Sequence, residues 1–333
     1  MRVLLTGGHG FVGSHLVDAL LARGDRVRCL HRRRTRPESL VGKEVEVAHG
    51  DVRDAGAVAR AIEGVDEVYH LAALTRSRTR AEMWATNVTA TRVLLEAGAR
   101  AGLPGRFVFC SSLAAVGPSP GGEDLTEEAP CRPVTWYGES KAQAEAEVLR
   151  FRDRLAVTVI RPPAVYGPRD RDFLALFRSA ARGFLPILGG GGRTCHLVYA
   201  ADLAEAFVRA ARAPATIGRT YFAAHPERVT DEVLLDCIER AVGRRGRRVR
   251  IPLSTLCLIA AVGEIGAQAS ARAPLLNRQR LRDLIPRWWV CDARALRRDT
   301  GWTASTALSE GTARAAAWYR EHGWIPRSRS GSR

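Results

Sequence analysis

The chain has 333 residues and a formal net charge of +16, from 51 lysines and arginines against 35 acidic residues. This length allows a large hydrophobic core and a smaller second lobe. Basic residues gather at 31–34 and 244–248, but no stacking aromatic residues lie between them, which argues against a nucleic-acid partner.

The cysteines and the chain ends carry further expectations. The seven cysteines are scattered, odd in number and without metal-ligand spacing. We therefore expect reduced thiols, a cytoplasmic protein and no metal site. The chain begins with a strand-like run rather than a signal peptide, and no apolar stretch reaches about 20 residues, the length of a membrane span. The basic tail at 326–333 is expected to be disordered.

Strand-like and helical patterns alternate through the first half of the chain. The strand-like runs are 2–6, 26–30, 45–48, 66–71, 106–110 and 156–161. The helical patterns lie near 11–23, 54–62, 81–101 and 137–153. This alternation predicts an α/β fold with a doubly wound parallel sheet covered by helices on both faces. Ligands of such sheets bind outside the carboxyl ends of the strands.

The first strand leads directly into the sequence TGGHGFVG at 6–13, and a helical pattern follows. Glycines spaced in this way between a strand and a helix form a dinucleotide-binding fingerprint. Gly7 permits the tight turn, Gly10 lets backbone N–H groups approach a pyrophosphate, and Gly13 allows the helix to pack closely on the strand.

The end of the second strand indicates which dinucleotide binds. An acidic residue there accepts hydrogen bonds from the ribose of NAD, whereas basic residues accommodate the additional phosphate of NADP. His31, Arg32 and Arg33 stand at this place, and no carboxylate does. A guanidinium can form a paired hydrogen bond to phosphate. The sequence therefore predicts NADP(H), with NAD as the alternative.

Tyr137 and Lys141 are the candidate catalytic pair. The chain has only two lysines, and this one follows the tyrosine by four residues in a helical pattern, so both side chains lie on one face. A nearby cation lowers the pKa of a phenol and makes it usable as a general acid or base at neutral pH. We therefore expect a lowered pKa for Tyr137.

Together these motifs resemble the extended branch of the short-chain dehydrogenase/reductase superfamily, the NAD-dependent epimerase/dehydratase type. The resemblance runs from Met1 to about Trp324, and it is closest to hydroxysteroid dehydrogenase-like and flavonol reductase-like members. The motifs that carry it are T-G-x-x-G-F-x-G at 6–13, Asp51-Val52, YHLAA at 69–73, Asn87, Ser111-Ser112, Tyr137-x-x-x-Lys141 and RPPAVYGP at 161–168.

The resemblance implies a division of the chain. Residues 1–167 would form a Rossmann domain that binds NAD(P), completed by strands from within 168–225. Residues 168–325 would form a smaller C-terminal substrate-binding lobe interleaved with the sheet. A homodimer paired through the helices near 81–101 and 137–153 is expected.

The resemblance also implies the site residues. Ser112 would donate to a substrate oxygen, Tyr137 would exchange the proton, and Lys141 would bond the nicotinamide ribose. Asp51 would hold the adenine, although Asp51 or Asp54 could instead cap the next helix. The implied cofactor-binding residues are Gly7, Gly10, Phe11, Val12, Gly13, His31, Arg32, Arg33, Asp51, Val52, Leu71, Ala72, Ala73, Asn87, Ser111, Tyr137, Lys141, Pro162, Pro163 and Val165. The hydroxyl of Ser111 is also expected to cap backbone groups.

Two departures from the family bear on the reaction. Dehydratases carry an Asp-Glu pair where this chain has Leu113-Ala114, which argues against dehydration. Sugar-nucleotide epimerases carry an arginine where this chain has Cys195-His196, but Arg193 stands close enough to leave that activity open. His196 is interpreted as a packed or capping residue.

An apolar stretch at 251–266 has Glu264 as its one charge and is interpreted as a buried helix or a lid over the substrate, with core packing as the alternative. Trp288 and Trp289 would wall the pocket or fill the core. The leading hypothesis is an NADP(H)-dependent oxidoreductase acting on a ketone or secondary alcohol of an apolar small molecule. The alternatives are a sugar-nucleotide epimerase that retains NAD(P), and a non-catalytic dinucleotide-binding sensor or scaffold, which the retained Tyr137 and Lys141 disfavour.

Overall fold

The computed structural model describes residues 1–32, 38–268 and 277–326, and for 262–268 and Glu38 only the backbone. The predicted cofactor residue Arg33 and all but the first residue of the tail at 326–333 lie outside these ranges. No helix within the described residues is both long enough and apolar enough to cross a bilayer.

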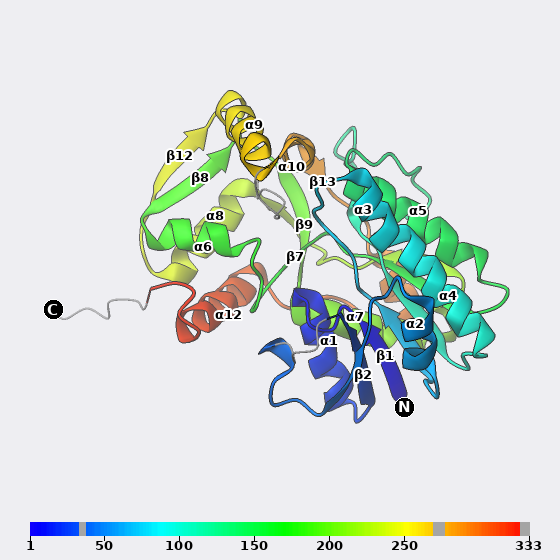
Figure 1. Ribbon diagram of the computed structural model, residues 1–333. Helices are drawn as coiled ribbons and strands as arrows, with labels where there is room; N and C mark the ends of the chain where they lie inside the picture. Colours follow the sequence, from blue (N-terminus) through cyan, green and yellow to red (C-terminus); the bar gives the residue numbers. More distant parts are fainter. Residues whose placement is uncertain (33–37, 269–276, 327–333) are drawn as a thin grey trace.

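A parallel sheet of seven strands forms the larger part of the molecule, in the order β10-β6-β5-β4-β1-β2-β3 (Figure 1). The strand order reverses beside β1, which places the predicted switch point there. The predicted Rossmann fold is confirmed. Its strands are β1 (Arg2–Thr6), β2 (Arg26–His31), β3 (Val45–His49), β4 (Glu67–His70), β5 (Arg106–Cys110), β6 (Ala156–Arg161) and β10 (Arg219–Phe222).

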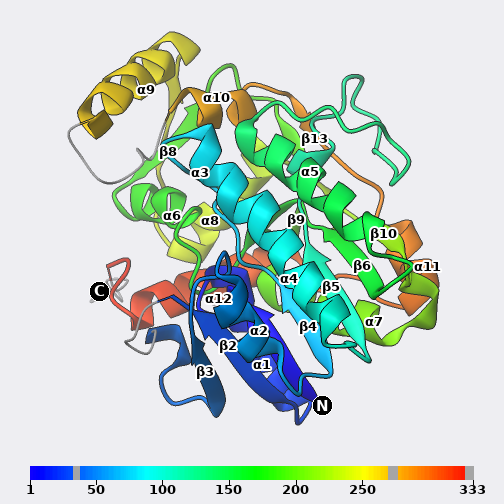
Figure 2. The same ribbon diagram turned by 45° about the vertical axis from the view of Figure 1, so that its right-hand side comes forward.

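Helices cover both faces of this sheet (Figure 2). On one face, α1 (Phe11–Ala22) and α7 (Ala200–Arg212) bury residues such as Leu16 and Phe207 against the strands. On the other face, α2 (Ala55–Ile62), α4 (Ala90–Arg100) and α5 (Trp136–Arg150) do the same. Apolar residues on one side of each helix therefore produce the two core layers that the sequence pattern predicts.

The helix predicted near 81–101 differs from a continuous α-helix. It consists of α3 (Arg80–Trp84), a π-helical turn η2 (Ala85–Thr89), and α4. A π turn adds one residue to the helix and often occurs at functional sites. This one contains Asn87, whose side chain is buried.

The second lobe carries the smaller sheets and most of the remaining helices. Strand β9 pairs with β7, β11 and β13, while β8 pairs with β12. These strands are β7 (Ala164–Tyr166), β8 (Phe184–Leu188), β9 (Thr194–Tyr199), β11 (Arg228–Thr230), β12 (Arg247–Ile251) and β13 (Trp288–Trp289). The helices are α6 (Leu174–Ala181), α8 (Asp231–Val242), α9 (Leu253–Gln268), α10 (Arg278–Leu284) and α12 (Leu308–Glu321). Short turns of 3-10 helix are η1 (Glu38–Leu40), η3 (Leu113–Ala115) and η4 (Pro214–Thr216).

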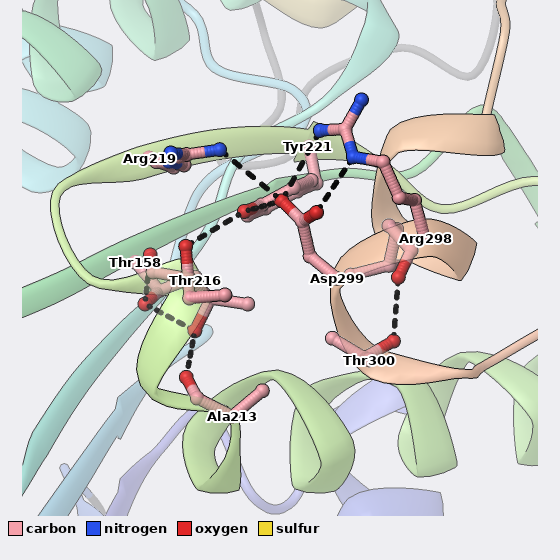
Figure 3. Close-up of polar contacts among 10 residues, drawn as sticks. Thr158, Ala213, Thr216, Arg219, Tyr221, Arg298, Asp299 and Thr300 are labelled. Atoms are coloured by element: carbon pink, nitrogen blue, oxygen red, sulfur yellow. Dashed lines mark hydrogen bonds and ion pairs between the residues drawn. The ribbon is translucent and has the colours of Figure 1, made fainter.

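The edge strand β10 is tied to α11 (Arg294–Thr300) by a cluster of polar contacts (Figure 3). The hydroxyl of Tyr221 donates to Oδ2 of Asp299 at 2.7 Å, and Nε of Arg298 donates to Oδ1 of the same carboxylate at 2.8 Å. Thr158 on β6 donates to the carbonyl of Thr216 at 3.0 Å. These contacts fix the last strand of the sheet against a helix from the end of the chain.

The apolar stretch at 251–266 is largely α9, and the described side chains of that helix, 253–261, are mostly exposed. Leu256 and Ala260 are buried, but Leu258 is 65% exposed and Ile259 is 50% exposed. The helix packs by one face against α10 through Leu281. The sequence-based expectation of a buried helix was wrong because uniform apolarity does not indicate what covers each face of a helix.

Candidate active site

The glycine loop has the geometry that the fingerprint predicts. Gly7 has a φ of +76°, and a Cβ there would lie 2.7 Å from the backbone nitrogen of Ala72. A Cβ on Gly13 would lie 2.1 Å from the carbonyl oxygen of Gly7. Gly10 precedes the first residue of α1, whose N-terminus carries no side-chain cap. The loop is therefore a cradle of backbone groups that side chains at Gly7 and Gly13 would close.

The carboxyl ends of β2 and β3 carry the residues predicted to select the cofactor. His31 is buried, with its ring centroid 4.5 Å from that of His9. Arg32 is exposed. Asp51 accepts hydrogen bonds from Nε and Nη2 of Arg53, at 3.0 and 2.8 Å, and these bonds lower the pKa of its carboxyl.

The open question of the helix cap is answered by Asp54, which accepts hydrogen bonds from two backbone N–H groups of α2. Asp51 is therefore not the N-cap of this helix. Val52, one of the implied cofactor-binding residues, is 7% exposed and packs in the core beside α2.

A chain of hydrogen bonds begins at the glycine loop and passes through His70, which is 1% exposed. The hydroxyl of Thr91 donates to the carbonyl of Asn87, so it accepts from Nε2 of the neutral His70 ring, and Nδ1 of that ring accepts the proton of the Thr6 hydroxyl at 2.6 Å. Nε2 of His70 then donates to the hydroxyl of Thr91 at 2.9 Å. This arrangement requires a neutral ring with the proton on Nε2. Burial lowers the pKa of His70 to about 3, which keeps the ring neutral.

The same chain continues to the catalytic helix through Asn87. Thr91 donates to the carbonyl of Asn87 at 2.7 Å, and Nδ2 of Asn87 donates to the hydroxyl of Ser140 at 2.9 Å. Ser140 donates to the carbonyl of Tyr137 at 2.8 Å. Asn87 also exchanges two hydrogen bonds with the backbone of Leu74. Asn87 therefore connects the loop after β4 with the start of α5.

Ser112 and Tyr137 lie together, and Lys141 lies one helical turn from the tyrosine. Ser112 lies beside the phenol of Tyr137 and favours a lower pKa for it. The Lys141 ammonium is 2% exposed and donates to the carbonyl of Cys110 at 2.6 Å. Gly138 permits this arrangement, because a Cβ there would lie 2.2 Å from the carbonyl oxygen of Ala114 in the turn after Ser112. The sequence analysis missed Gly138, although its place directly after the tyrosine is a usable signal.

The expected lowering of the Tyr137 pKa does not occur. Burial raises the pKa of Tyr137 well above its usual value, and the neighbouring Ser112 opposes that shift only in part. The cation of Lys141 is directed to the Cys110 carbonyl instead of the phenol. Tyr137 is therefore a neutral phenol, able to donate its proton.

The hydroxyl of Ser111 has no hydrogen-bond partner among the described residues, although the residue is 1% exposed. The predicted backbone cap is therefore not formed. Nearby, the carbonyl of Pro162 accepts from the backbone nitrogen of Leu113 at 2.8 Å, which joins the RPP segment to the serine turn. Pro163 is buried, and Val165 is half-buried in β7. An unsatisfied buried hydroxyl and an open glycine cradle are features that a bound dinucleotide would complete.

A cavity of about 30 Å³ lies beside Tyr137. This volume accommodates water but no organic substrate. Its polar side comes from α10, where Gln279 accepts from the backbone nitrogen of Trp136 at 2.9 Å. The residues that line it are Thr75, Arg76, Ser77, Met83, Thr135, Trp136, Tyr137, Asn277, Gln279, Arg280 and Asp283. Residues 251–266 were the expected lid, but no described residue of α9 lines the cavity, whereas Gln279, Arg280 and Asp283 of α10 do.

Asp283 is the acidic residue among those that line the cavity. Burial raises its pKa to about 6, against the opposing effect of Arg280. Its Oδ1 atom has no hydrogen-bond partner within the described residues. The sequence analysis missed Asp283 because residues 277–285 carry no motif.

Comparison with known proteins places this site in a family. Residues 3–224 match the model of the NAD dependent epimerase/dehydratase family. The chain belongs to this family. It is an enzyme of the extended short-chain dehydrogenase/reductase type, and its curated relatives include reductases and dehydrogenases.

The chain resembles two family members with lipid-related names. It is 39% identical over 198 residues to sterol demethylase protein B of Methylococcus capsulatus, covering 56% of this chain and 60% of that protein. It is 29% identical over 328 residues to the ceramide reductase of Caulobacter vibrioides, covering 98% of this chain and 96% of that protein. The crystal structure of gox2253 superposes with a TM-score of 0.80 at 27% identity, over 97% of this chain and 99% of that one.

Within the epimerase/dehydratase family, Arg193 and His196 bear on the reaction. Arg193 forms a two-pronged ion pair with Asp231, at 3.1 and 3.0 Å. His196 is 2% exposed, and its Nδ1 accepts from the backbone nitrogen of Cys291 at 3.0 Å. Both side chains already have structural partners, as the sequence predicts for His196. Trp289 donates to the carbonyl of Asp283 at 2.9 Å and packs beside the serine turn, so it supports the pocket without lining it.

The catalytic helix α5 is anchored from behind by a buried ion pair. Arg161, at the end of β6, donates to both carboxylate oxygens of Glu145 on α5, at 2.9 and 2.7 Å. Their side chains are 7% and 4% exposed. Because the two donors and two acceptors are parallel, this pair fixes the rotation of α5 as well as its distance from the sheet.

Proposed function

We propose that the protein is an NADP(H)-dependent reductase that converts a ketone of an apolar small molecule into a secondary alcohol, and that catalyses the reverse oxidation. The observation that carries the proposal is that Ser112 lies beside the phenol of Tyr137, which lines the cavity, with the buried ammonium of Lys141 one helical turn away. Such a set can hold a carbonyl oxygen and deliver a proton to it.

The protonation state of Tyr137 favours reduction. The cofactor supplies the hydride when it is bound. A carbonyl oxygen that gains negative charge needs a proton donor, and a phenol with a raised pKa carries its proton at neutral pH. The hydroxyl of Ser112 holds the same oxygen in line with the phenol, while Lys141 contributes a fixed positive charge to the site.

The proposed substrate is largely apolar. Met83, Trp136 and Tyr137 present carbon-rich surfaces to the cavity, and its other lining residues, Gln279 and Asp283 among them, are polar or charged. The names of two relatives refer to a sterol and a ceramide. A molecule with one or two oxygens on a hydrocarbon framework suits this combination.

The alternatives fit the site less well. An epimerase acting on sugar nucleotides needs a cation for the diphosphate, and the candidate Arg193 is held by Asp231. A sensor or scaffold would have no need for Ser112, Tyr137 and Lys141 together. We further propose that the enzyme is a cytoplasmic homodimer that pairs through α4 and α5, as the resemblance implies.

The proposed reaction is tested by incubating the protein and NADPH with apolar ketones and, separately, with sugar nucleotides. We expect one NADPH to be oxidised for each ketone reduced, followed by the nicotinamide absorbance and by chromatography of the alcohol. Interconversion of sugar nucleotides without a net absorbance change would instead assign the site to an epimerase.

Replacement of Arg32 by alanine is expected to weaken the use of NADPH selectively. Loss of one charge-assisted hydrogen bond to the phosphate corresponds to a decrease of about 10- to 100-fold in kcat/KM for NADPH. The value for NADH should change by less than about threefold, since NADH lacks that phosphate. Arg26→Ala, at the exposed opposite end of β2, is the matched control and should leave both values unchanged. An equal loss with both cofactors, or a parent enzyme that prefers NADH, would contradict the assignment of NADP.

A further inference from the structure

An exposed apolar surface lies on the second lobe and has no role in the proposed chemistry. We call it the α9 surface and define it by Phe184 on β8, Val249 on β12, and Leu253, Leu258 and Ile259 on α9. Phe184, Leu258 and Ile259 are 53%, 65% and 50% exposed. In both views α9 lies at the outer edge of the molecule, next to β8 (Figures 1 and 2). Side chains of this kind are normally covered when they occur together.

Strand register places the apolar residues of β8 and β12 on the sheet face that carries α9. Ile251 pairs with Leu188, and both pack against the buried side of α9. Side chains two residues apart in a strand share one face of the sheet, so Val249 and Phe184 point to the same side as these two residues. The exposed apolar side chains of the two-stranded sheet therefore lie on the same side of the sheet as α9.

Exposed arginines lie beside this apolar surface, on β12 and the turn before it. Arg245, Arg247 and Arg250 are exposed, and none of them forms an ion pair with a described residue. Arg247 shares the sheet face of Val249, and Arg250 lies on the other face of the same strand. The acidic groups nearby on α8 already have partners. Asp236 pairs with Arg248, and Glu239 accepts from the backbone nitrogen of Gly246 at 2.6 Å. The surface thus combines aliphatic side chains that can enter a hydrocarbon layer with cations that remain at its edge.

We propose that the α9 surface binds the surface of an anionic lipid bilayer, with α9 lying in the plane of the headgroups and not spanning the membrane. Aliphatic side chains inserted at the acyl boundary and arginines paired with anionic headgroups both contribute to such binding. A second copy of the chain is a poorer occupant. A twofold interface would place two surfaces that carry the same positive charge against each other.

The position of the α9 surface connects it with the cavity. Leu281 of α10 packs against α9, and Gln279, Arg280 and Asp283 of the same helix line the cavity beside Tyr137. Bilayer binding therefore brings the helix that closes the cavity next to the hydrocarbon layer. The binding itself rests on no assumption about the reaction, so it can be measured without substrate.

The proposal is tested by flotation of the purified protein with vesicles. We expect binding to vesicles that contain phosphatidylglycerol, little binding to pure phosphatidylcholine, and release as salt is raised. The double variants Leu258→Ser/Ile259→Ser and Arg247→Gln/Arg250→Gln should each lower the vesicle partition coefficient by about tenfold or more. Matched controls elsewhere on the surface are Val41→Ser/Ile217→Ser and Arg60→Gln/Arg152→Gln, which should bind as the parent does.

Circular dichroism and NADPH titration show whether each variant is folded, independently of lipid. Equal binding by the parent and by the folded variants of the α9 surface would overturn the proposal. A second result would also overturn the proposal. In it, the parent does not bind anionic vesicles and sediments as a dimer, whereas the Leu258→Ser/Ile259→Ser variant sediments as a monomer. That result would assign the α9 surface to contact between two copies of the chain.

Discussion

Replacement of Tyr137 by phenylalanine is expected to lower kcat by about 10²- to 10⁴-fold, the usual contribution of a positioned general acid. The change removes one hydroxyl, while Gly138 and the anchor of α5 keep the ring in place. The affinity for NADPH should therefore stay within about threefold of that of the parent. Steady-state kinetics and a fluorescence titration with NADPH measure the two quantities separately.

Tyr221→Phe provides the matched control for this prediction. It also removes a buried phenol oxygen, here one that donates to Asp299 at 2.7 Å, far from the cavity residues. We expect a loss of stability of about 1 to 3 kcal/mol and an unchanged kcat. A Tyr137→Phe enzyme with nearly the turnover of the parent would show that another group supplies the proton.

Replacement of Arg161 by methionine is expected to destabilise the fold by about 3 to 5 kcal/mol, because it leaves the carboxylate of Glu145 buried without its partner. Urea unfolding followed by circular dichroism measures this difference. The double variant Arg161→Met/Glu145→Leu should recover much of the stability, since neither charge then remains buried.

An exposed ion pair serves as the control for the buried one. Arg100 and Glu96 lie one helical turn apart on α4 and are both well exposed. Arg100→Met is expected to change stability by less than about 1 kcal/mol. If Arg161→Met were as mild as this variant, the pair with Glu145 would not be what holds α5 against the sheet.

The sequence predicted the elements of the large sheet well because two independent signals coincided there. The apolar runs have the length of buried strands. Glycines or polar residues end each run at the carboxyl edge of the sheet, where ligands bind. The roles of Gly7 and Gly13 in the turn could be predicted from the fingerprint, and the structure shows that neither position has room for a side chain.

Other features could not be predicted because they depend on contacts between distant segments. The π turn at Ala85–Thr89 has no signal in local pattern, and Asp283 reaches the cavity only because α10 packs beside Trp136. The pKa of Tyr137 depends on how deeply the residue is buried, which the spacing to Lys141 does not reveal. The exposure of Leu258 was missed for the same reason.

The hydrogen-bonded chain from Thr6 through His70 and Asn87 to Ser140 has a consequence for protein engineering. The hydroxyls of Thr6, Thr91 and Ser140 each donate to a specific acceptor in this chain. The segments that carry these hydroxyls therefore cannot be exchanged independently of one another. A chimera that exchanges the β1–α1 segment for that of another enzyme would have to retain Thr6. Without Thr6, Nδ1 of His70 would lose its hydrogen-bond donor. The contacts that continue from His70 through Thr91 and Asn87 to Ser140 would then be disturbed.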